Sequence, residues 1–133
     1  FVPRQAMCER AFAHLRHVEV SAIEQEMGET SRTLYTLRAL QAAHPDWSLR
    51  LIIGADILNE TERWFGWPEI VQIAPPLVLG RLGHGRPDAP PAVVPQVSST
   101  DVRHRLARGL PVDDVVPLGV IEYAREHRLY GSI

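Results

Sequence analysis

The chain has 133 residues, of which 45% are hydrophobic and 23% are charged, and its formal net charge is −2. These values are typical of one globular domain and exclude a disordered or fibrous chain. The slightly acidic balance argues against a nucleic-acid surface, which needs an excess of basic side chains, so we expect a small-molecule ligand. Cys8 is the only cysteine, which excludes an internal disulfide or a thiolate metal site and fits a cytoplasmic location. No apolar run approaches the roughly 20 residues of a membrane-spanning helix, so we expect no membrane partner.

The first third of the chain predicts a helix, a strand, a loop and a second helix. Residues 4–15 carry apolar side chains at helical spacing, which predicts a surface helix. Residues 18–20 alternate Val with Glu and predict a short strand, and the polar residues 24–30 predict a loop. The second helix is expected to open at Ser31 and to end before Pro45, because proline cannot continue the hydrogen-bond ladder.

The rest of the chain alternates between predicted strands and helices. Residues 49–53 form an almost continuous apolar run, which is typical of a buried strand in a parallel sheet. Further strands are expected at 76–79 and 92–94, with a loop rich in Gly and Pro between them. Further helices are expected to begin at Pro68, after Ser98 and at Pro117, the last ending near His127. We therefore predict one α/β domain over residues 1–133, with a parallel sheet flanked by helices.

Residues 97–103, Val-Ser-Ser-Thr-Asp-Val-Arg, lie where a predicted strand leads into a helix. Ser98 and Asp101 fit the capping pattern in which a hydroxyl and a carboxylate satisfy free amides of the first helical turn. A helix start also attracts anions, because its unpaired amides and the positive end of its dipole converge there. Arg103 adds a guanidinium suited to phosphate. The stretch predicts either a phosphate site or an ordinary capped helix.

A second candidate site follows the predicted buried strand. Ligands of open α/β sheets bind at the carboxyl ends of the strands, and Gly54 and Asp56 come directly after residues 49–53. Glycine lets a ligand approach the backbone closely, and a carboxylate accepts hydrogen bonds from a ribose or an amide. The alternative is a turn followed by a helix cap.

Several of these stretches, in this order, resemble the bacterial nicotinate-mononucleotide adenylyltransferases, a family of the nucleotidylyltransferase superfamily. Residues 97–103 resemble the family motif I-S-S-T-x-x-R, with Val97 in place of Ile. Residues 51–58, with Trp64 and Trp67 after them, are similar to the family's strand, G-x-D motif and paired tryptophans. Looser similarities connect residues 81–84 with an R-P-G-Y turn, residues 31–33 with S-Y-T, Arg4 and Met7 with R-x-x-M, and residues 123–130 with the closing helix. The resemblance covers nearly the whole chain and implies a Rossmann-like parallel sheet flanked by helices.

One part of the family pattern does not occur in this sequence. It is the signature G-G-T-F-D-P-x-H-x-G-H, which follows the family's first strand and supplies glycines and two histidines to the site. We therefore expect the chain to be amino-terminally incomplete, to lack the first strand of the sheet, and to be inactive on its own. Within the matched stretches, Arg32 stands where the family has Tyr, Tyr35 where it has an acid, and Leu82 and His84 where it has Pro and Tyr. These departures leave the nucleotide preference open.

The resemblance also implies a reaction and a set of site residues. The phosphate of nicotinate mononucleotide attacks the α-phosphorus of ATP, which releases pyrophosphate and forms nicotinate adenine dinucleotide, a precursor of NAD. Arg103 is the implied catalytic residue and balances charge on the departing pyrophosphate. The implied ATP-binding residues are Gly54, Asp56, Ser98, Ser99, Thr100 and Arg103, and the implied nicotinate mononucleotide-binding residues are Thr33, Trp64, Trp67 and Arg81. Mg²⁺ is the implied cofactor, held through the phosphates of ATP and not by a set of protein ligands.

Two other functions remain open. One is a related adenylyltransferase with a different acceptor, such as nicotinamide mononucleotide. The other is a degenerate, non-catalytic nucleotide-binding module. The site residues have structural alternatives as well, because tryptophans are often part of a core and an arginine on a capped helix is often only exposed. The sequence also leaves open whether the chain forms a homo-oligomer.

Overall fold

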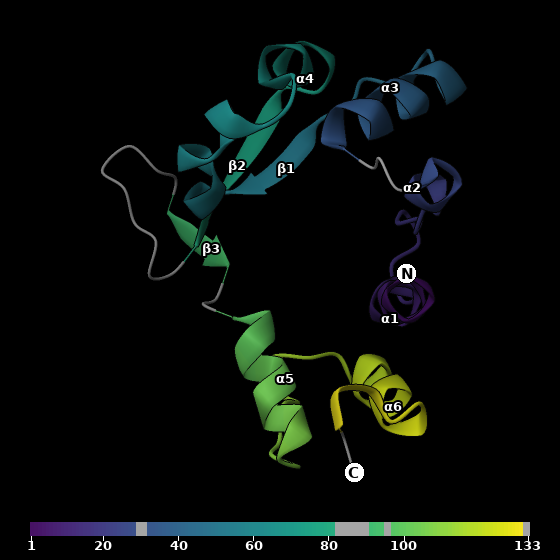
Figure 1. The fold of residues 1–133 in the computed structure, drawn as a ribbon, viewed down its shortest axis with the longest axis vertical. Coiled ribbons are helices and arrows are strands. Elements are labelled where there is room, and N and C mark those ends of the chain that lie inside the picture. Colours follow the sequence, from purple (N-terminus) through teal and green to yellow (C-terminus); the bar gives the residue numbers. More distant parts are fainter. Residues whose placement is uncertain (29–31, 82–90, 95–96, 132–133) are drawn as a thin grey trace. The chain divides into compact units, whose positions relative to one another are not determined.

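Helices and short parallel strands make up the computed structural model, which describes residues 1–28, 32–81, 91–94 and 97–131 (Figure 1). The chain divides into two compact units. The terminal unit consists of Phe1–Ala22 and Val97–Ile133, and the central unit of Ile23–Gln96. The single domain over residues 1–133 stays a prediction.

The central unit is built on a parallel sheet, as the sequence predicts. Its described strands are β1 (Leu51–Gly54), β2 (Pro76–Arg81) and β3 (Ala92–Val94), in the spatial order β1-β2-β3 with both pairs parallel. Its described helices are α2 (Ile23–Glu26), α3 (Thr33–Ala43) and α4 (Trp67–Ile73), with 3-10 helices at Ala55–Asn59 and Thr61–Arg63. The register pairs Gly54 with Leu79, so β1 and β2 end near the same edge of the sheet.

The core of the central unit lies between α3 and α4. Leu34 and Leu37 lie three residues apart on one face of α3 and pack against Ile70 and Ala74. Ile70 and Ala74 have no exposed surface. The partly buried hydrophobic residues around this cluster are Leu49, Leu51, Trp64, Trp67 and Ile73.

Gly66 fixes the start of α4. Its φ of +70° lies in the left-handed region, which glycine adopts without steric cost. A Cβ at this position would also come within 2.4 Å of a methyl carbon of Leu34. Pro68 follows in the first turn, where its missing N–H breaks no helical hydrogen bond. The sequence around the second tryptophan thus sets both where α4 begins and how closely it approaches α3.

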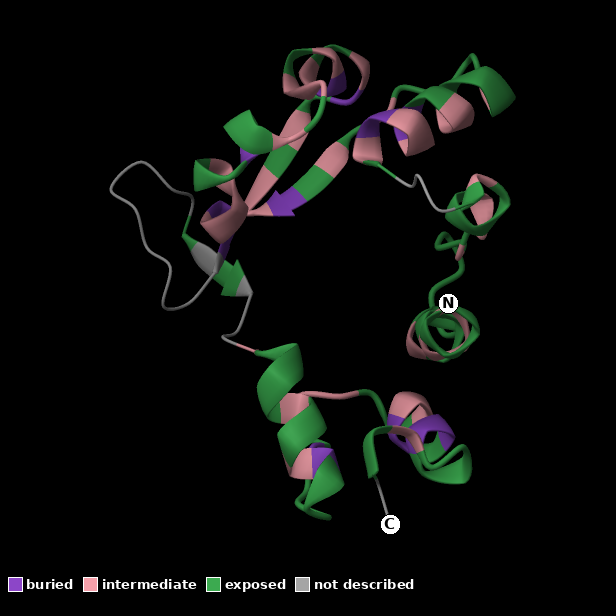
Figure 2. Cartoon of the chain, viewed as in Figure 1, coloured by how far each residue is buried: buried purple, intermediate pink, exposed green. Residues whose placement is uncertain are grey.

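The two faces of the sheet differ in exposure. Ile53 of β1 is 5% exposed, whereas its neighbour Ile52 is 62% exposed, because successive side chains of a strand point to opposite faces. The alternation along β1 can be followed in Figure 2. Leu77 of β2 and Val93 of β3 are exposed too.

The terminal unit contains α1 (Val2–Phe12), α5 (Ser99–Ala107), α6 (Leu118–Glu126) and a 3-10 helix at Leu129–Gly131. Its buried cluster consists of Leu106, Val112 and Ile121, with Val102 and Val116 packed against it. α1 packs against α6, and the guanidinium carbon of Arg10 lies 4.7 Å from the centroid of the Tyr123 ring. In the part of the chain that is described, no helix has both the length and the apolar character needed to cross a membrane.

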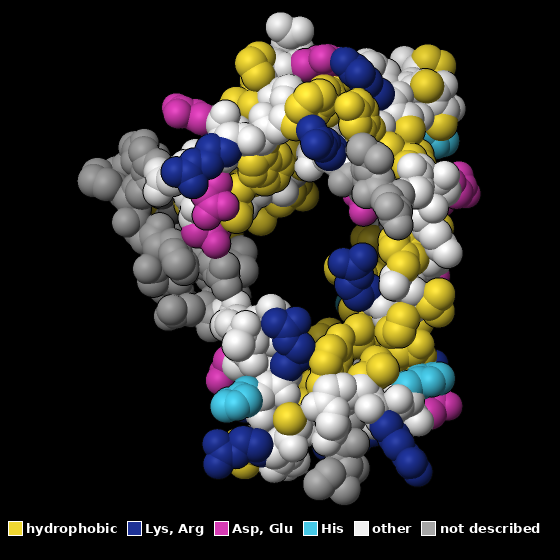
Figure 3. Space-filling model, viewed as in Figure 1, with side chains coloured by type: hydrophobic (Ala, Val, Ile, Leu, Met, Phe, Trp, Pro, Cys, Tyr) yellow, Lys and Arg dark blue, Asp and Glu magenta, His cyan; other side chains and the backbone are white. Residues whose placement is uncertain are grey.

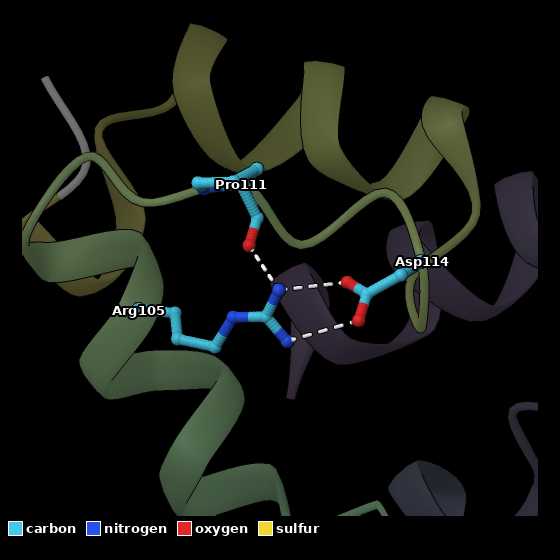
Figure 4. A network of polar contacts seen from close by, with 3 residues as sticks. All are labelled: Arg105, Pro111 and Asp114. Atoms are coloured by element: carbon cyan, nitrogen blue, oxygen red, sulfur yellow. Dashed lines mark hydrogen bonds and ion pairs between the residues drawn. The ribbon is translucent and has the colours of Figure 1, made fainter.

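Arg105 ties α5 to the loop that precedes α6 (Figure 4). Its guanidinium donates a hydrogen bond to Oδ1 of Asp114 at 2.7 Å and another to the backbone carbonyl oxygen of Pro111. The hydrogen bond from Arg105 holds the pKa of the Asp114 carboxyl below its ordinary value, against the opposite effect of partial desolvation. These contacts of Arg105 connect α5 with the segment between α5 and α6.

Some predicted elements differ from the structure. The predicted strand at 18–20 is wrong, since these residues have no regular structure. The backbone N–H of Val18 bonds to the carbonyl of Leu15, in a local turn and not in a strand ladder. The predicted loop at 24–30 overlaps the short helix α2, which runs from Ile23 to Glu26. The expected helix start at Ser31 lies outside the described residues, as do residues 82–90 of the predicted loop rich in Gly and Pro.

Candidate functional site

The carboxyl end of β1 brings Gly54 and Asp56 together. Gly54 is the last residue of the strand, and Asp56 lies in the first turn of the 3-10 helix that follows. A Cβ on Gly54 would lie 2.3 Å from Oδ1 of Asp56, so the carboxylate lies in the space that the glycine leaves open. The two residues are therefore in close contact at the edge where ligands of parallel sheets bind.

Arg81 ends the neighbouring strand. It is the last residue of β2, and its backbone is paired with that of Val94 in β3. Because β1 and β2 are parallel and Gly54 is paired with Leu79, Arg81 follows two residues further along the same edge. The backbones of Gly54 and Arg81 thus lie toward the same edge of the sheet.

An aromatic pocket of about 440 Å³ lies elsewhere in the central unit. It contains Thr33 and Trp64, two of the residues predicted to bind nicotinate mononucleotide. The complete lining is Arg32, Thr33, Arg63, Trp64, Phe65 and Ile70. Figure 3 shows basic side chains standing beside hydrophobic ones on this unit. The pocket therefore combines flat apolar walls with positive charge.

Trp67 does not line this pocket. It belongs to the first turn of α4 and packs against the core. Its ring meets that of Trp64 edge to face, with 5.8 Å between the ring centroids and an interplanar angle of 81°. Trp67 thus contacts the ring of Trp64, and both pack against the core cluster.

Arg32 and Phe65 line the pocket and were not among the predicted site residues. The guanidinium carbon of Arg32 lies 4.6 Å from the centroid of the Phe65 ring, which is cation–π geometry. Phe65 also contacts Tyr35 of α3, with 5.6 Å between the ring centroids. In the sequence, the only sign of this arrangement is an arginine at a position where the family has Tyr.

The start of α5 carries the other predicted residues. Ser98 is the N-cap, with extended φ and ψ of −110° and 126°, and its carbonyl accepts the first helical hydrogen bond from Val102. The predicted side-chain cap is wrong, because the side chain of the N-cap residue Ser98 makes no capping hydrogen bond in the described part of the chain. The amides of the first turn are therefore left for water or an anion.

Arg103 and Thr100 lie one helical turn apart on α5. Nη2 of Arg103 is 3.4 Å from Oγ1 of Thr100, at the long end of hydrogen-bond distance. Arg103 and Ser99 also line a largely apolar pocket of about 400 Å³ within the terminal unit. A hydroxyl, a guanidinium and open amides thus lie close together at one end of α5.

Among the described residues, no group of three or more His, Cys, Asp or Glu side chains could hold a metal ion. The predicted site residues fall into two groups. Ser98, Ser99, Thr100 and Arg103 belong to the terminal unit, and Thr33, Gly54, Asp56, Trp64, Trp67 and Arg81 to the central unit.

Known proteins identify the family. No family model matches the chain. In an alignment of 137 positions the chain is 42% identical to an Anaeromyxobacter sp. (strain K) protein named "Probable nicotinate-nucleotide adenylyltransferase", and the match covers 98% of this chain and 71% of that protein. The chain belongs to the nicotinate-nucleotide adenylyltransferase family. Proteins of the same name from Myxococcus xanthus and Streptomyces coelicolor are 42% and 37% identical, over 98% and 84% of this chain and 70% and 64% of their own lengths.

The fold of the family is also found among solved structures. A chain described as "Plasmodium falciparum nicotinic acid mononucleotide adenylyltransferase complexed with APC" matches with a TM-score of 0.75. The match covers 98% of this chain and 75% of that one at 16% sequence identity, so it speaks for the fold alone. The predicted Rossmann-like nucleotidylyltransferase fold is thereby confirmed. Which residues of this adenylyltransferase bind each substrate stays a prediction.

Proposed function

We propose that the chain transfers the adenylyl group of ATP to nicotinate mononucleotide, a step of NAD biosynthesis. The observation that carries this proposal is 42% identity across 98% of the chain to a relative named for the reaction. In the proposed step, a phosphate oxygen of the mononucleotide bonds to the α-phosphorus of ATP. The bond from that phosphorus to the oxygen bridging to the β-phosphate breaks, and pyrophosphate leaves. The product is nicotinate adenine dinucleotide.

The start of α5 is the proposed phosphate site for ATP. Its first-turn amides have no side-chain cap, and Ser98, Ser99 and Thr100 add hydroxyl groups beside them. Arg103 is the proposed catalytic residue, because its guanidinium can neutralise charge as pyrophosphate departs. Phosphoryl-type transfer needs no protein nucleophile, since alignment and charge neutralisation do most of the work. This group of residues suits such a reaction.

The central unit supplies the proposed contacts to the nucleoside and the pyridine ring. Gly54 and Asp56 are proposed to lie against ATP, with the Asp56 carboxylate accepting hydrogen bonds from a ribose or an amide. Thr33 and Trp64 are proposed to hold the pyridine ring, which the pocket they share supports. Trp67 is proposed to act through its edge-to-face contact with Trp64. Arg81 is proposed to meet a phosphate or carboxylate of the mononucleotide.

Mg²⁺ is the proposed cofactor, and ATP and nicotinate mononucleotide are the proposed substrates. When bound to the phosphates of ATP, the ion supplies charge neutralisation at the reacting centre. The donors at the start of α5 fit a metal held in this way, because hydroxyls and amides bind phosphate oxygens. We also propose a cytoplasmic location, which the single cysteine of the sequence suits.

The experiment is an acceptor assay on the complete gene product. Pyrophosphate and dinucleotide are measured with ATP and Mg²⁺ and with nicotinate mononucleotide, nicotinamide mononucleotide or no acceptor. We expect equal amounts of both products with the nicotinate acceptor and a background rate without it. Binding of ATP with no transfer to either acceptor would instead indicate a non-catalytic nucleotide-binding module. Transfer to the amide acceptor alone would indicate the related adenylyltransferase.

A further inference from the structure

We propose that Arg32 selects the acid form of the mononucleotide over the amide, by binding the carboxylate of the pyridine ring in the aromatic pocket. This proposal rests on the proposed function and names the residue that decides the acceptor. It commits to one ligand chemistry, an aromatic ring that carries a carboxylate. Three features of the pocket carry it: where Arg32 is fixed, what holds its side chain, and which charges surround it.

The backbone of Arg32 is fixed at the entrance of α3. Its carbonyl oxygen accepts hydrogen bonds from the N–H groups of Tyr35 and Thr36, at 2.9 and 3.1 Å. Arg32 is therefore the N-cap of an 11-residue helix, with φ and ψ of −126° and 144°. The positive end of the α3 dipole lies beside it and adds to the attraction for an anion. The next residue, Thr33, lines the same pocket.

Among the described residues, the partner found for the Arg32 side chain is an aromatic ring and not an acid. Its guanidinium carbon is 4.6 Å from the centroid of the Phe65 ring, and Phe65 is itself held by its contact with Tyr35. Stacking on a ring leaves the N–H groups at the guanidinium edge directed outward in its plane. The arginine is thus ordered before a ligand arrives, which reduces the entropy lost on binding.

Arg38 gives the contrast within the same helix. Nε and Nη2 of Arg38 donate to the two carboxylate oxygens of Glu69, both at 2.7 Å. Its charge is therefore neutralised within the protein, and it does not line the pocket. Arg38, in α3, thus forms an ion pair with Glu69, whereas Arg32, the N-cap of α3, contacts the face of an aromatic ring.

The charges around the pocket favour an anion. Among the described residues that line it, Arg32 and Arg63 are basic and none is acidic. A guanidinium matches a carboxylate with two parallel hydrogen bonds. A carboxamide at the same position presents an N–H₂ group toward donors that cannot accept from it, which penalises the amide. The flat ring of Trp64 is in reach of the same ligand, because it lines the same pocket.

The test compares acceptor selectivity in the complete gene product. We measure kcat/KM with nicotinate mononucleotide and with nicotinamide mononucleotide, at saturating ATP and Mg²⁺, for the wild type and Arg32→Gln. Glutamine keeps the first part of the aliphatic stem and removes the charged guanidinium that lies over Phe65. We expect the acid-to-amide ratio of kcat/KM to fall about 10- to 100-fold, the scale for losing a hydrogen bond to a charged group. Arg32→Lys keeps the charge without the planar fork, so we expect an intermediate ratio.

Arg38→Gln is the matched control, because it removes a charge from the same helix but outside the pocket. We expect it to leave the acid-to-amide ratio at the wild-type value. If Arg32→Gln also keeps that ratio while the wild type is active, the role of Arg32 is overturned and the proposed function stands. An equal loss with both acceptors likewise overturns it, since a structural role affects both. A wild type that adenylylates neither acceptor overturns both proposals.

Discussion

A carboxylate oxygen of Asp56 lies where a side chain on Gly54 would have to go. The distance from an ideal Cβ on Gly54 to Oδ1 of Asp56 is 2.3 Å, far inside van der Waals contact. The backbone at Gly54 is ordinary extended structure, with φ of −73° and ψ of 150°. Any residue adopts this conformation, so the glycine is needed for the room it gives the carboxylate. Gly54 thus leaves the space that the Asp56 carboxylate occupies at the carboxyl end of β1.

Gly54→Ala is therefore expected to impair activity without unfolding the protein. The new methyl group must displace the Asp56 carboxylate, and a misplacement of about 1 Å at a substrate contact can lower kcat/KM about 100-fold. The unfolding temperature should change little, since alanine suits the local φ and ψ. Steady-state kinetics with varied ATP, together with thermal unfolding, measures both effects.

Gly119→Ala is the matched control for this substitution. A Cβ on Gly119 would lie 3.5 Å from Cβ of Arg10, an ordinary contact. Because Gly119 lies inside α6, alanine should raise the free energy of unfolding by up to about 1 kcal/mol. Its kcat/KM should match the wild type. Wild-type kinetics in Gly54→Ala would show that the position of Asp56 does not matter for the reaction.

The ion pair between Arg105 and Asp114 predicts a pH dependence of stability. The hydrogen bond from Arg105 lowers the pKa of the Asp114 carboxyl in the folded protein. A lowered folded-state pKa contributes stability that is present above the unfolded-state pKa, about 3.9 for Asp, and is lost as the pH falls through the folded-state value. Asp114→Asn should therefore lower the unfolding temperature at pH 7, and the difference from the wild type should shrink steadily below about pH 4.

Asp113→Asn controls for the change of net charge, because Asp113 is exposed and lies next to Asp114. We expect its unfolding temperature to differ less from the wild type at pH 7 than that of Asp114→Asn. Thermal unfolding between pH 2.5 and 8 measures both variants. A difference between Asp114→Asn and the wild type that stays constant over this range would contradict the ion pair as its source.

Substitution of Ile70 is expected to cause the largest loss of stability in the central unit. It is fully buried between α3 and α4, so Ile70→Ala leaves a cavity and should lower the free energy of unfolding by about 3 kcal/mol. Leu118, which is 66% exposed, is the control, and Leu118→Ala should change that free energy by less than about 0.5 kcal/mol. Chemical denaturation of both variants decides. Equal losses would mean that the packing of α3 on α4 does not stabilise the protein.

The order of helices and strands could largely be predicted from the sequence, because their signals are local. The apolar run at 49–53 became β1, and the proline and glycine around Trp67 mark the start of α4 as expected. The strand predicted at 18–20 did not form, because alternation of apolar and polar side chains alone provides no partner for the backbone N–H and C=O groups. The side-chain cap at Ser98 failed for a related reason, since a capping pattern shows that a hydrogen bond fits and not that it forms.

The site could be predicted only in part. Thr33 and Trp64 are far apart in the sequence, and the family resemblance assigned both to one substrate before the pocket that they share was known. Phe65 and Arg32 were missed because their contact depends on how Gly66 and Leu34 bring the residues before α4 against α3. Such packing leaves no local pattern. The departure from Tyr to Arg at position 32 was the one available signal.

Arg103 carries the prediction that bears most directly on the chemistry. Its guanidinium lies beside the Thr100 hydroxyl, at a helix start without a side-chain cap, which suits an anion whose charge grows during the reaction. Arg103→Ala should therefore lower kcat by about 10²- to 10³-fold, the scale for losing one donor that stabilises developing charge. The KM for nicotinate mononucleotide should change much less, since the proposed contact of Arg103 is with ATP. Arg108→Ala, which removes an exposed arginine from the C-terminal end of the same helix, should keep the wild-type kcat. Near-normal turnover in Arg103→Ala would remove this residue from the mechanism and leave the open amides of α5 as the principal phosphate contact.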